Sequence, residues 1–447
     1  MHRKTLALVV IVLCFAGLAR AQDWETISFP GNVKIWDMDI DGSTLWFSTQ
    51  GEGIVGYDAG TWVTHTQADG GIRNDYWNNS LLITSGGDRW VTRDNNSTLD
   101  RLDDNGTFAY KDDDVWSYYG YPDQLANKRA FSAAEDSEGR VWIGMRDENL
   151  NRLGVLELFI ENSDTTSSDD EWFHYDNVWT PDSTSFGGDD VRAVMVDDQD
   201  RLWIGYYGSG IDLWDYGNPR VFADDEWTHF AEEDGLPEDD VHTFWQGTDG
   251  TIWAGTLGGL AAYDEQTGTW SSISGLPGTQ ARAISEDAQG HIWVGTNDGV
   301  TMLYANRTVA FTYTTDDGLT DEQVDHVSID RATGDVWAVT KNIGADTTTL
   351  HRFRSGIVEG TGKLFVYPNP WREGESEGQI QIYGAPEGST IEVFDVTGEK
   401  MTELAPSEPY VWDSLDDSLN EVPSGVYLVR VEVPGGETEI LKLAIVR

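Results

Sequence analysis

The chain has very little cysteine and little positive charge. Its 447 residues include one cysteine, Cys14, and 29 Lys and Arg residues against 78 Asp and Glu residues. A single thiol cannot form a disulfide within the chain, so stability must come from the burial of apolar surface. A surface this acidic repels the phosphates of nucleic acids and anionic lipids, and we therefore expect no nucleic-acid partner.

Long apolar runs are also scarce, and the one clear example lies at the N-terminus. A basic start is followed by apolar residues 6–18, too short a run to span a bilayer comfortably, and then by Ala19-Arg20-Ala21, which suits a signal peptidase. We interpret residues 1–21 as a signal peptide, with a membrane anchor as the alternative. Its removal leaves 26 basic residues against 78 acidic ones, a net charge of −52, and no candidate membrane helix.

Strong catalytic signatures are missing as well. The sequence has no HExxH, no phosphate-binding glycine loop, no Gly-x-Ser-x-Gly and no cysteine–histidine pair. The segment Asp37-Met38-Asp39-Ile40-Asp41-Gly42 is similar to the start of a calcium loop, but the twelfth position is Ser48 instead of Glu. We predict a binding protein rather than an enzyme, and no cofactor, with calcium at residues 37–42 as the alternative.

Tryptophan is abundant, and its positions follow a repeat. A strand-like phrase with a central Trp recurs seven times, at spacings of 44, 52, 61, 50, 40 and 44 residues. These tryptophans are Trp46, Trp90, Trp142, Trp203, Trp253, Trp293 and Trp337. A four-stranded propeller blade takes about 40–50 residues. The period therefore predicts an all-β fold with a seven-bladed β-propeller, and an open solenoid is the alternative.

Each repeat unit contains four short strands. An apolar first strand ends in an Asp/Gly turn before the Trp strand, a glycine-led third strand follows, and the fourth strand opens on an aromatic residue. One such opening aromatic residue, Trp24, precedes the first blade, whereas none follows residues 350–353 of the last blade. We therefore predict that residues 24–29 pair beside residues 350–353 and complete the seventh sheet.

The later blades resemble a known family. Asp234-Gly235-Leu236-Pro237, followed by Asp249-Gly250-Thr251-Ile252-Trp253-Ala254-Gly255-Thr256 and Gly259-Leu260, is similar to the two-component-regulator propeller repeat. The resemblance covers about residues 23–357. In that family the propeller is often the extracytoplasmic sensor of a membrane histidine kinase. The resemblance therefore implies a sensor-like module that binds a ligand outside the cytoplasm.

The sequence pattern changes after the propeller, which we assign to residues 22–357. Residues 358–363 read as a linker, and residues 364–447 contain about six or seven short strands with turn residues between them. This pattern favours a small Ig-like β-sandwich.

The motifs of this second domain also resemble known families. Their order is similar to that of the sorting domain of type IX secretion and of the Ig-like domain of flagellar hook-capping proteins. The resemblance implies recognition by the type IX secretion machinery. It also implies a secreted protein, or one at the outer-membrane surface of a Gram-negative-type bacterium, that travels through the periplasm. An ordinary accessory sandwich is the alternative. The motifs are Tyr367-Pro368-Asn369-Pro370, Asp395-Val396-Thr397-Gly398 and Ser424-Gly425-Val426-Tyr427, before a terminal apolar strand.

Propeller geometry narrows the search for a ligand site, because the innermost strands all start at one end of the channel. Counting eleven residues back from each blade Trp, or twelve in blade seven, gives Ile35, Asn79, Phe131, Arg192, His242, Arg282 and Asp325. We predict that Arg192, His242, Arg282 and Asp325, in successive blades, converge on a polar or anionic ligand. The alternative is that they neutralise one another and bind water.

Aromatic residues outside the repeat positions are expected near the same channel end. Flat rings there suit stacking on the apolar face of a sugar, and plain loop packing is the alternative. They are Trp36, Trp77, Trp179, Tyr206 and Tyr207.

These features together predict an exported binding or sensor-like module, with an extracellular glycan among its possible ligands. One alternative is a propeller lyase or hydrolase that acts on a polysaccharide or lactone. In that case His242 would act as base, while Arg192 or Arg282 would stabilise developing negative charge. A structural or adhesive surface protein is the third possibility, since propellers host all three functions.

Overall fold

The structure is a computed structural model of the chain. It describes residues 24–31, 33–73, 75, 78–93, 98–120, 125, 129–146, 156–161, 170–175, 186–217, 225–355, 365–367, 371–372, 379–383, 385, 389–405, 410–432 and 438–447. The expected signal peptide (1–21) and linker (358–363) lie outside these residues. Across the described part of the chain, no helix is both long and apolar enough to cross a membrane.

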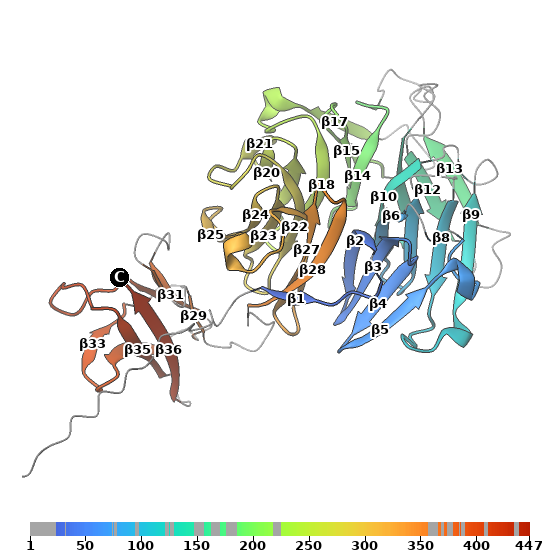
Figure 1. The fold of residues 1–447 in the computed structure, drawn as a ribbon. Coiled ribbons are helices and arrows are strands. Elements are labelled where there is room, and N and C mark those ends of the chain that lie inside the picture. The colour runs from blue at the N-terminus through green and yellow to red at the C-terminus, as the bar shows by residue number, and fades with distance from the viewer. Residues whose placement is uncertain are drawn as a thin grey trace, which may run out of the picture.

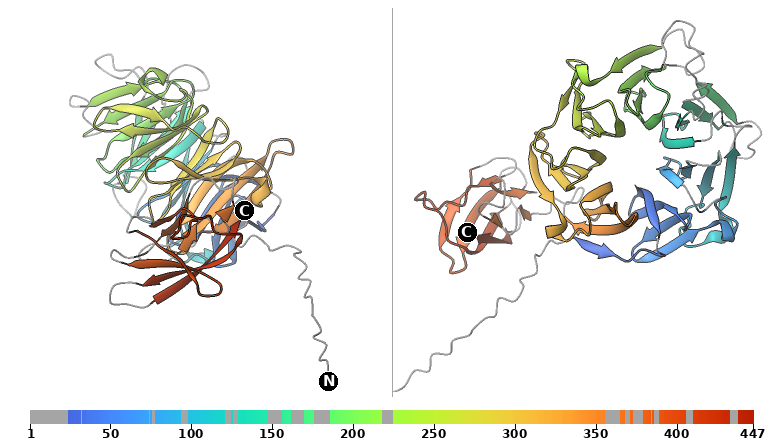
Figure 2. Two further views of the ribbon diagram at one scale, coloured as in Figure 1. Left: turned by 90° about the vertical axis from the view of Figure 1, so that its left-hand side faces the viewer. Right: turned by 45° about the horizontal axis from the view of Figure 1, so that its top comes forward.

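Seven four-stranded antiparallel sheets surround a central channel, and the right-hand view of Figure 2 shows them as a ring. Blade one is β2 (Lys34–Asp41), β3 (Thr44–Gln50), β4 (Ile54–Asp58) and β5 (Thr61–His65). Blade two is β6 (Asn78–Ile83), β7 (Arg89–Arg93), β8 (Thr98–Asp103) and β9 (Val115–Gly120). Blade three is β10 (Arg129–Glu135), β11 (Val141–Arg146), β12 (Leu156–Ile160) and β13 (Glu171–Tyr175).

The remaining blades repeat this order from the channel outward. Blade four is β14 (Val191–Val196), β15 (Leu202–Tyr206), β16 (Ile211–Asp215) and β17 (Glu226–Phe230). Blade five is β18 (Val241–Gln246), β19 (Ile252–Thr256), β20 (Gly259–Asp264) and β21 (Thr269–Ser272). Blade six is β22 (Ala281–Glu286), β23 (Ile292–Thr296), β24 (Gly299–Leu303) and β25 (Val309–Tyr313). The seven-bladed propeller predicted from the tryptophan period is confirmed.

The two ends of the propeller sequence share blade seven, as predicted. This sheet contains β26 (Gln323–Asp330), β27 (Asp335–Asn342) and β28 (Thr347–Arg354), and β1 (Glu25–Ile27) forms its outer strand. The register pairs Glu25 with Arg352, Thr26 with His351 and Ile27 with Leu350. In Figure 1 the blue β1 accordingly lies beside the orange β28. This pairing closes the ring without leaving a sheet one strand short.

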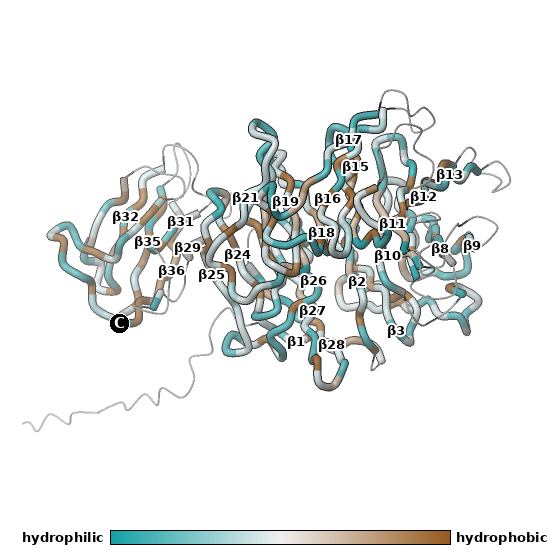
Figure 3. Tube along the Cα trace, turned by 90° about the horizontal axis from the view of Figure 1, so that it is seen from above, coloured by the Kyte–Doolittle hydropathy of each residue, from teal (hydrophilic) through white to brown (hydrophobic). Residues whose placement is uncertain are grey.

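The repeated tryptophans fill the interfaces between blades. All seven of these tryptophans, one in the second strand of each blade, are at most 3% exposed. Each one packs into the next blade: Trp46, for example, shares a core with Leu81 and Val91 of blade two. In three blades the indole N–H also donates to an aspartate of the preceding turn, as from Trp293 to Asp287 at 3.0 Å. In Figure 3, brown apolar segments alternate with teal ones along the strands of the ring. Burial between blades therefore stabilises the ring without disulfides.

The calcium alternative at residues 37–42 does not fit the geometry of this segment. The aspartates lie on the strand β2, and their carboxylates contact groups of the two neighbouring blades instead of surrounding a cation. Asp37 accepts from the backbone N–H of Leu81 at 2.9 Å, and Asp39 accepts from that of Ile83 at 3.1 Å. Asp41 lies 3.3 Å from the Arg89 guanidinium. A calcium loop needs converging oxygens on a tight turn, whereas these acids join blade one to its neighbours.

The last part of the chain, red in Figure 1, forms two sheets around one core. The central buried residues include Ile391, Val429 and Leu443, each with no exposed surface. One sheet is β29 (Phe365–Tyr367), β31 (Ile380–Tyr383) and β34 (Tyr410–Trp412). The other is β30 (Trp371–Arg372), β36 (Thr438–Val446), β35 (Gly425–Glu432), β32 (Thr390–Asp395) and β33 (Lys400–Glu403). The predicted small β-sandwich is therefore present.

Candidate ligand site at the channel mouth

Every blade carries a β-bulge near the start of its innermost strand. In blade four, for example, Val191 pairs with Tyr206 and Ala193 with Gly205, so Arg192 is the extra residue. A bulge takes one residue out of the ladder and redirects its side chain. Residues at this position line a single cavity of about 540 Å³ in the channel. They are Trp36, Asn79, Phe131, Arg192, His242, Arg282 and Asp325.

Six of these seven positions agree with the count made from the sequence, and the exception is in blade one. Ile35 is only 2% exposed and packs in the core between blades seven and one, while Trp36 takes the bulge position. The cause is a turn that is shorter by one residue: four residues separate the paired Ile40 and Leu45 in blade one, whereas five separate the paired Val196 and Leu202 in blade four. The expected inner position of Ile35 was therefore wrong by one residue.

Arg192 is held in a fixed orientation at the mouth. Its Nε lies 2.8 Å from Asp190 Oδ1, and its Nη2 donates to Asp190 Oδ2 at 2.9 Å. The guanidinium carbon lies 4.3 Å from the centre of the Phe131 ring and 5.3 Å from that of Tyr207. A guanidinium placed between two rings and a carboxylate loses little additional freedom when it binds a ligand.

Arg282 and Asp325 form the next part of the ring. Arg282 donates from Nε and Nη2 to Gln280 Oε1 at 3.0 and 2.7 Å, and its Nη1 lies 3.5 Å from Asp325 Oδ1. Asp325 also accepts from Gln323 at 2.6 Å and lies 4.0 Å from the Lys341 ammonium. The predicted residues therefore neutralise one another in part. The long Arg282–Asp325 contact leaves room for another acceptor.

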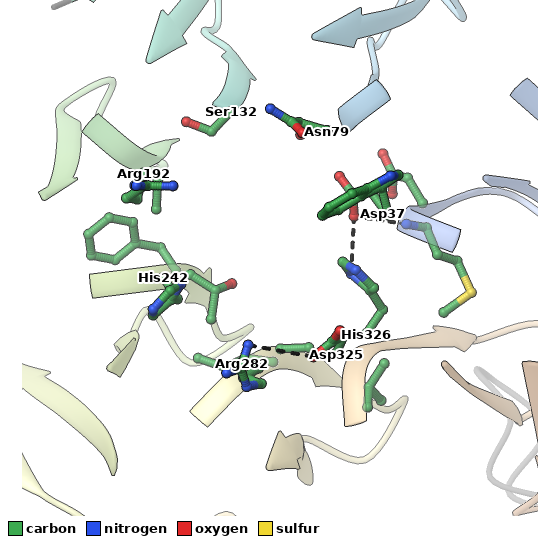
Figure 4. Close-up of a pocket in the computed structure, with 18 of the residues that line it drawn as sticks. Asp37, Asn79, Ser132, Arg192, His242, Arg282, Asp325 and His326 are labelled. Carbon is green, nitrogen blue, oxygen red and sulfur yellow. Dashed lines mark hydrogen bonds and ion pairs between the residues drawn. The ribbon is translucent and has the colours of Figure 1, made fainter. Parts of the chain in front are cut away.

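His242 lies between the two arginines on the ring, as Figure 4 shows. Its Nε2 is buried and has no hydrogen-bond partner among the described residues. Burial, followed by the charges of Arg282 and Arg192, lowers the pKa of His242 to about 4. The imidazole is therefore neutral at pH 7, with a polar atom still unsatisfied.

A second layer of polar groups lies one residue further along five of the seven inner strands. Asp37 and His326 form an ion pair at 3.3 Å across the cavity wall, drawn as a dashed line in Figure 4. Ser80, Ser132 and Thr243 also line this cavity. Sequence reasoning did not find Asp37, His326 or the nearby Lys341 as lining residues. Taking the residue that follows each bulge position in the sequence would have identified Asp37, Ser80, Ser132, Thr243 and His326.

The five predicted aromatic residues have different positions. Trp36 lines the cavity, and the Lys34 ammonium lies over its ring, 4.2 Å from the ring centre. Tyr207 is 55% exposed and lies beside Arg192. Tyr206 is fully buried, and its hydroxyl donates to Asp212 at 2.7 Å, so we leave it out of the site. Trp77 and Trp179 lie outside the described residues.

Within the described part of the chain, no group of three or more His, Cys, Asp or Glu side chains has the arrangement of a metal site. The Asp37 and Asp325 carboxylates and the His326 imidazole instead contact one another, neighbouring cations or backbone N–H groups.

Comparisons with known proteins place the fold. Residues 275–298 match the family described as two component regulator propeller. No curated protein sequence matches the chain. Among solved structures, PorZ of Porphyromonas gingivalis is described as an essential bacterial surface component of the type-IX secretion system. It matches with a TM-score of 0.63 and 18% identity, over 95% of this chain and 61% of that one.

Two further solved structures are similar. The extracellular domain of a protein described as a hybrid two component system from B. thetaiotaomicron has a TM-score of 0.58 and 16% identity, over 95% of this chain and 58% of that one. A catalytically inactive virginiamycin B lyase from Staphylococcus aureus, with quinupristin, has a TM-score of 0.54 and 14% identity, over 74% of this chain and 99% of that one. This chain spans about three fifths of the first two proteins. At these identities the likeness establishes the fold alone.

Proposed function

We propose that this chain is an exported propeller that binds a polar extracellular ligand, with carbohydrates as the first candidates, at the mouth of its channel. The supporting observation is the convergence of one bulge residue from each of seven blades on a single cavity of about 540 Å³. This volume lies within the range of small-molecule sites, and a concave pocket with a few converging polar groups is the usual form of such a site.

The carbohydrate part of the proposal depends on the mixed lining. Trp36 and Phe131 lie on one side of the ring, and Asn79, Ser80 and Ser132 supply groups that can bind hydroxyls. An aromatic face for the apolar side of a sugar, with amides and hydroxyls beside it, is the arrangement expected of a glycan site.

Binding to a glycan array tests this proposal directly. The probe is the mature chain, residues 22–447, and a variant with Arg192→Ala and Arg282→Ala is the comparison. We expect a restricted set of glycans to bind the wild type and to bind the variant at least about tenfold more weakly. Array-wide absence of binding, or equal binding by both proteins, would contradict a glycan site at the mouth.

Export and sorting form the second part of the proposal. The N-terminal pattern of residues 1–21 supports export, and the motif order in residues 364–447 supports a role in type IX secretion. The similarity of the chain to PorZ, described as a surface component of that system, agrees with this assignment. We propose that the protein reaches the outer-membrane surface or the medium through the periplasm.

A lyase is the alternative function that one observation favours. His242 is neutral and unpartnered between two arginines, which is an arrangement suited to proton abstraction beside a stabilised anion. A pKa of about 4 makes His242 a weak base at pH 7, however, because general bases work best when their pKa lies near the working pH. The weak basicity favours binding over catalysis. Release of unsaturated or ring-opened products from polysaccharide or lactone substrates, lost in His242→Ala, would reverse this choice.

A further inference from the structure

The ring of bulge residues has two chemically different halves. Blades four to seven contribute Arg192, His242, Arg282 and Asp325, whereas blades one to three contribute Trp36, Asn79 and Phe131. A ligand that fills the cavity therefore meets charge on one side and rings with an amide on the other. Its orientation is determined by the group that binds the charged half.

The centre of the charged half is His242. Arg192 with its partner Asp190 lies on one side, Arg282 with Asp325 on the other, and Asp240 precedes it by two residues. Burial lowers the pKa of His242 most, and the charges of Arg282 and Arg192 lower it further. Two cations therefore flank the imidazole, although the chain as a whole has a net charge of −49.

This half of the ring contains one unsatisfied polar atom and two arginines that are held in place. The Nε2 of His242 is buried without a partner, and Arg282 turns its Nη1 toward an acceptor that is 3.5 Å away. The opposite edges of both arginines are fixed by Asp190 and by Gln280. Donors held in place before binding recognise a planar or tetrahedral oxyanion with little loss of side-chain freedom.

We propose that the ligand binds through an oxyanion group, a carboxylate or a sulfate, that sits against His242 between Arg192 and Arg282. This inference depends on the proposed binding function and specifies its ligand as an acidic sugar. A bound anion favours the charged form of a nearby imidazole. His242 therefore takes up a proton when the anion binds, and binding becomes tighter as the pH falls below neutral.

Isothermal titration of the mature chain with three sugars tests this inference. The sugars are glucose, glucuronate and glucose 6-sulfate, each at pH 5.5 and pH 7.5. We expect both acidic sugars to bind at least about tenfold more tightly than glucose, because charge-assisted contacts are about twice as strong as neutral ones. We also expect binding of glucose 6-sulfate to be about threefold or more tighter at pH 5.5, since its sulfate does not titrate in this range.

The variant His242→Gln separates proton uptake from simple contact. Glutamine keeps a hydrogen-bond donor at this position but cannot become charged, so the pH dependence should disappear while the fold is retained. Titration in two buffers with different ionisation enthalpies measures the protons taken up, and Arg201→Gln, in the turn at the opposite end of β14 and β15, is the matched control.

The outcomes distinguish this inference from the wider proposal. Equal binding of glucose and the acidic sugars, lost in the double arginine variant, would overturn the oxyanion anchor but support a glycan site. Unchanged pH dependence in His242→Gln would overturn the assignment of His242. Failure of all three sugars would also overturn the oxyanion anchor, while the glycan array tests the wider binding function independently.

Discussion

Asp37 of blade one and His326 of blade seven form an ion pair of 3.3 Å across the point where the ring closes. The second oxygen of the same carboxylate accepts from the backbone N–H of Leu81, in blade two, at 2.9 Å. One side chain therefore joins three blades on the channel wall. This polar contact therefore spans the closure of the ring on the channel side, and the strand β1 spans it on the outer side.

Stability at high pH should depend on this ion pair. Although burial opposes it, the hydrogen bond and charge of Asp37 raise the pKa of His326 above its ordinary value of 6.5. A raised pKa in the folded state means that the contribution is complete below pH 6.5 and is lost as the pH rises through the folded-state pKa. We expect urea unfolding midpoints of the wild type to fall over this range, and those of His326→Gln to fall less. Parallel pH profiles for the two proteins would contradict this role. The pKa values of His174 and His229 are also raised, but both proteins contain these residues, so their effect on stability cancels in the comparison.

The outer strand of blade seven should carry a large share of the stability of the ring. Trp24 is 4% exposed, and its ring lies 5.4 Å from Phe353 and 6.0 Å from Tyr313. The Trp24→Ala variant should lose about 3–5 kcal/mol of unfolding free energy, as is typical of a large buried aromatic side chain. Equilibrium urea unfolding measures this loss. The control is Tyr110→Ala, because Tyr110 is 57% exposed; a Trp24→Ala loss no larger than that of the control would contradict closure by packing.

Binding and stability should respond differently to changes at the mouth. Arg192 and Arg282 have 23% and 26% of their side chains exposed and lie outside the cores between blades. Replacing both with alanine should weaken ligand binding by about 1.5–3 kcal/mol per residue, while the thermal midpoint changes little. The change Arg201→Ala, in the opposite turn, should leave binding unaltered. Normal binding by the double variant would reject the mouth as the site, whereas unfolding of that variant would contradict the expected stability.

Surface delivery should depend on the C-terminal sandwich. A chain that ends at residue 363 should fold as a propeller and remain in the periplasm of a host with type IX secretion, because it lacks the proposed sorting domain. Cell fractionation and surface labelling measure its position, and the full-length chain is the control. Normal appearance of the shortened protein at the surface would make the sandwich an accessory domain.

Some features of the site could be predicted from sequence because they follow the repeat. Arg192, His242, Arg282 and Asp325 were placed together by counting from the tryptophans, and all four line one cavity. Ile35 was misplaced because a single missing turn residue shifts a strand position and reverses the face of its side chain. The sequence predicts Tyr206 near the channel mouth, but this residue ends the strand β15 and is buried against Asp212.

The sequence by itself determined the number of blades, the closing strand and the change to a second β domain. These features arise from the spacing of apolar and aromatic residues, because a strand needs such residues wherever a blade must bury its face. Only the tertiary structure decided which polar groups meet in the channel. The contact of Asp37 with His326 joins residues on the first and last inner strands, and the bulges that redirect Arg192 and His242 depend on strand register. Side-chain contacts across the channel and local register are set by packing between blades, and a periodic pattern contains no direct record of either.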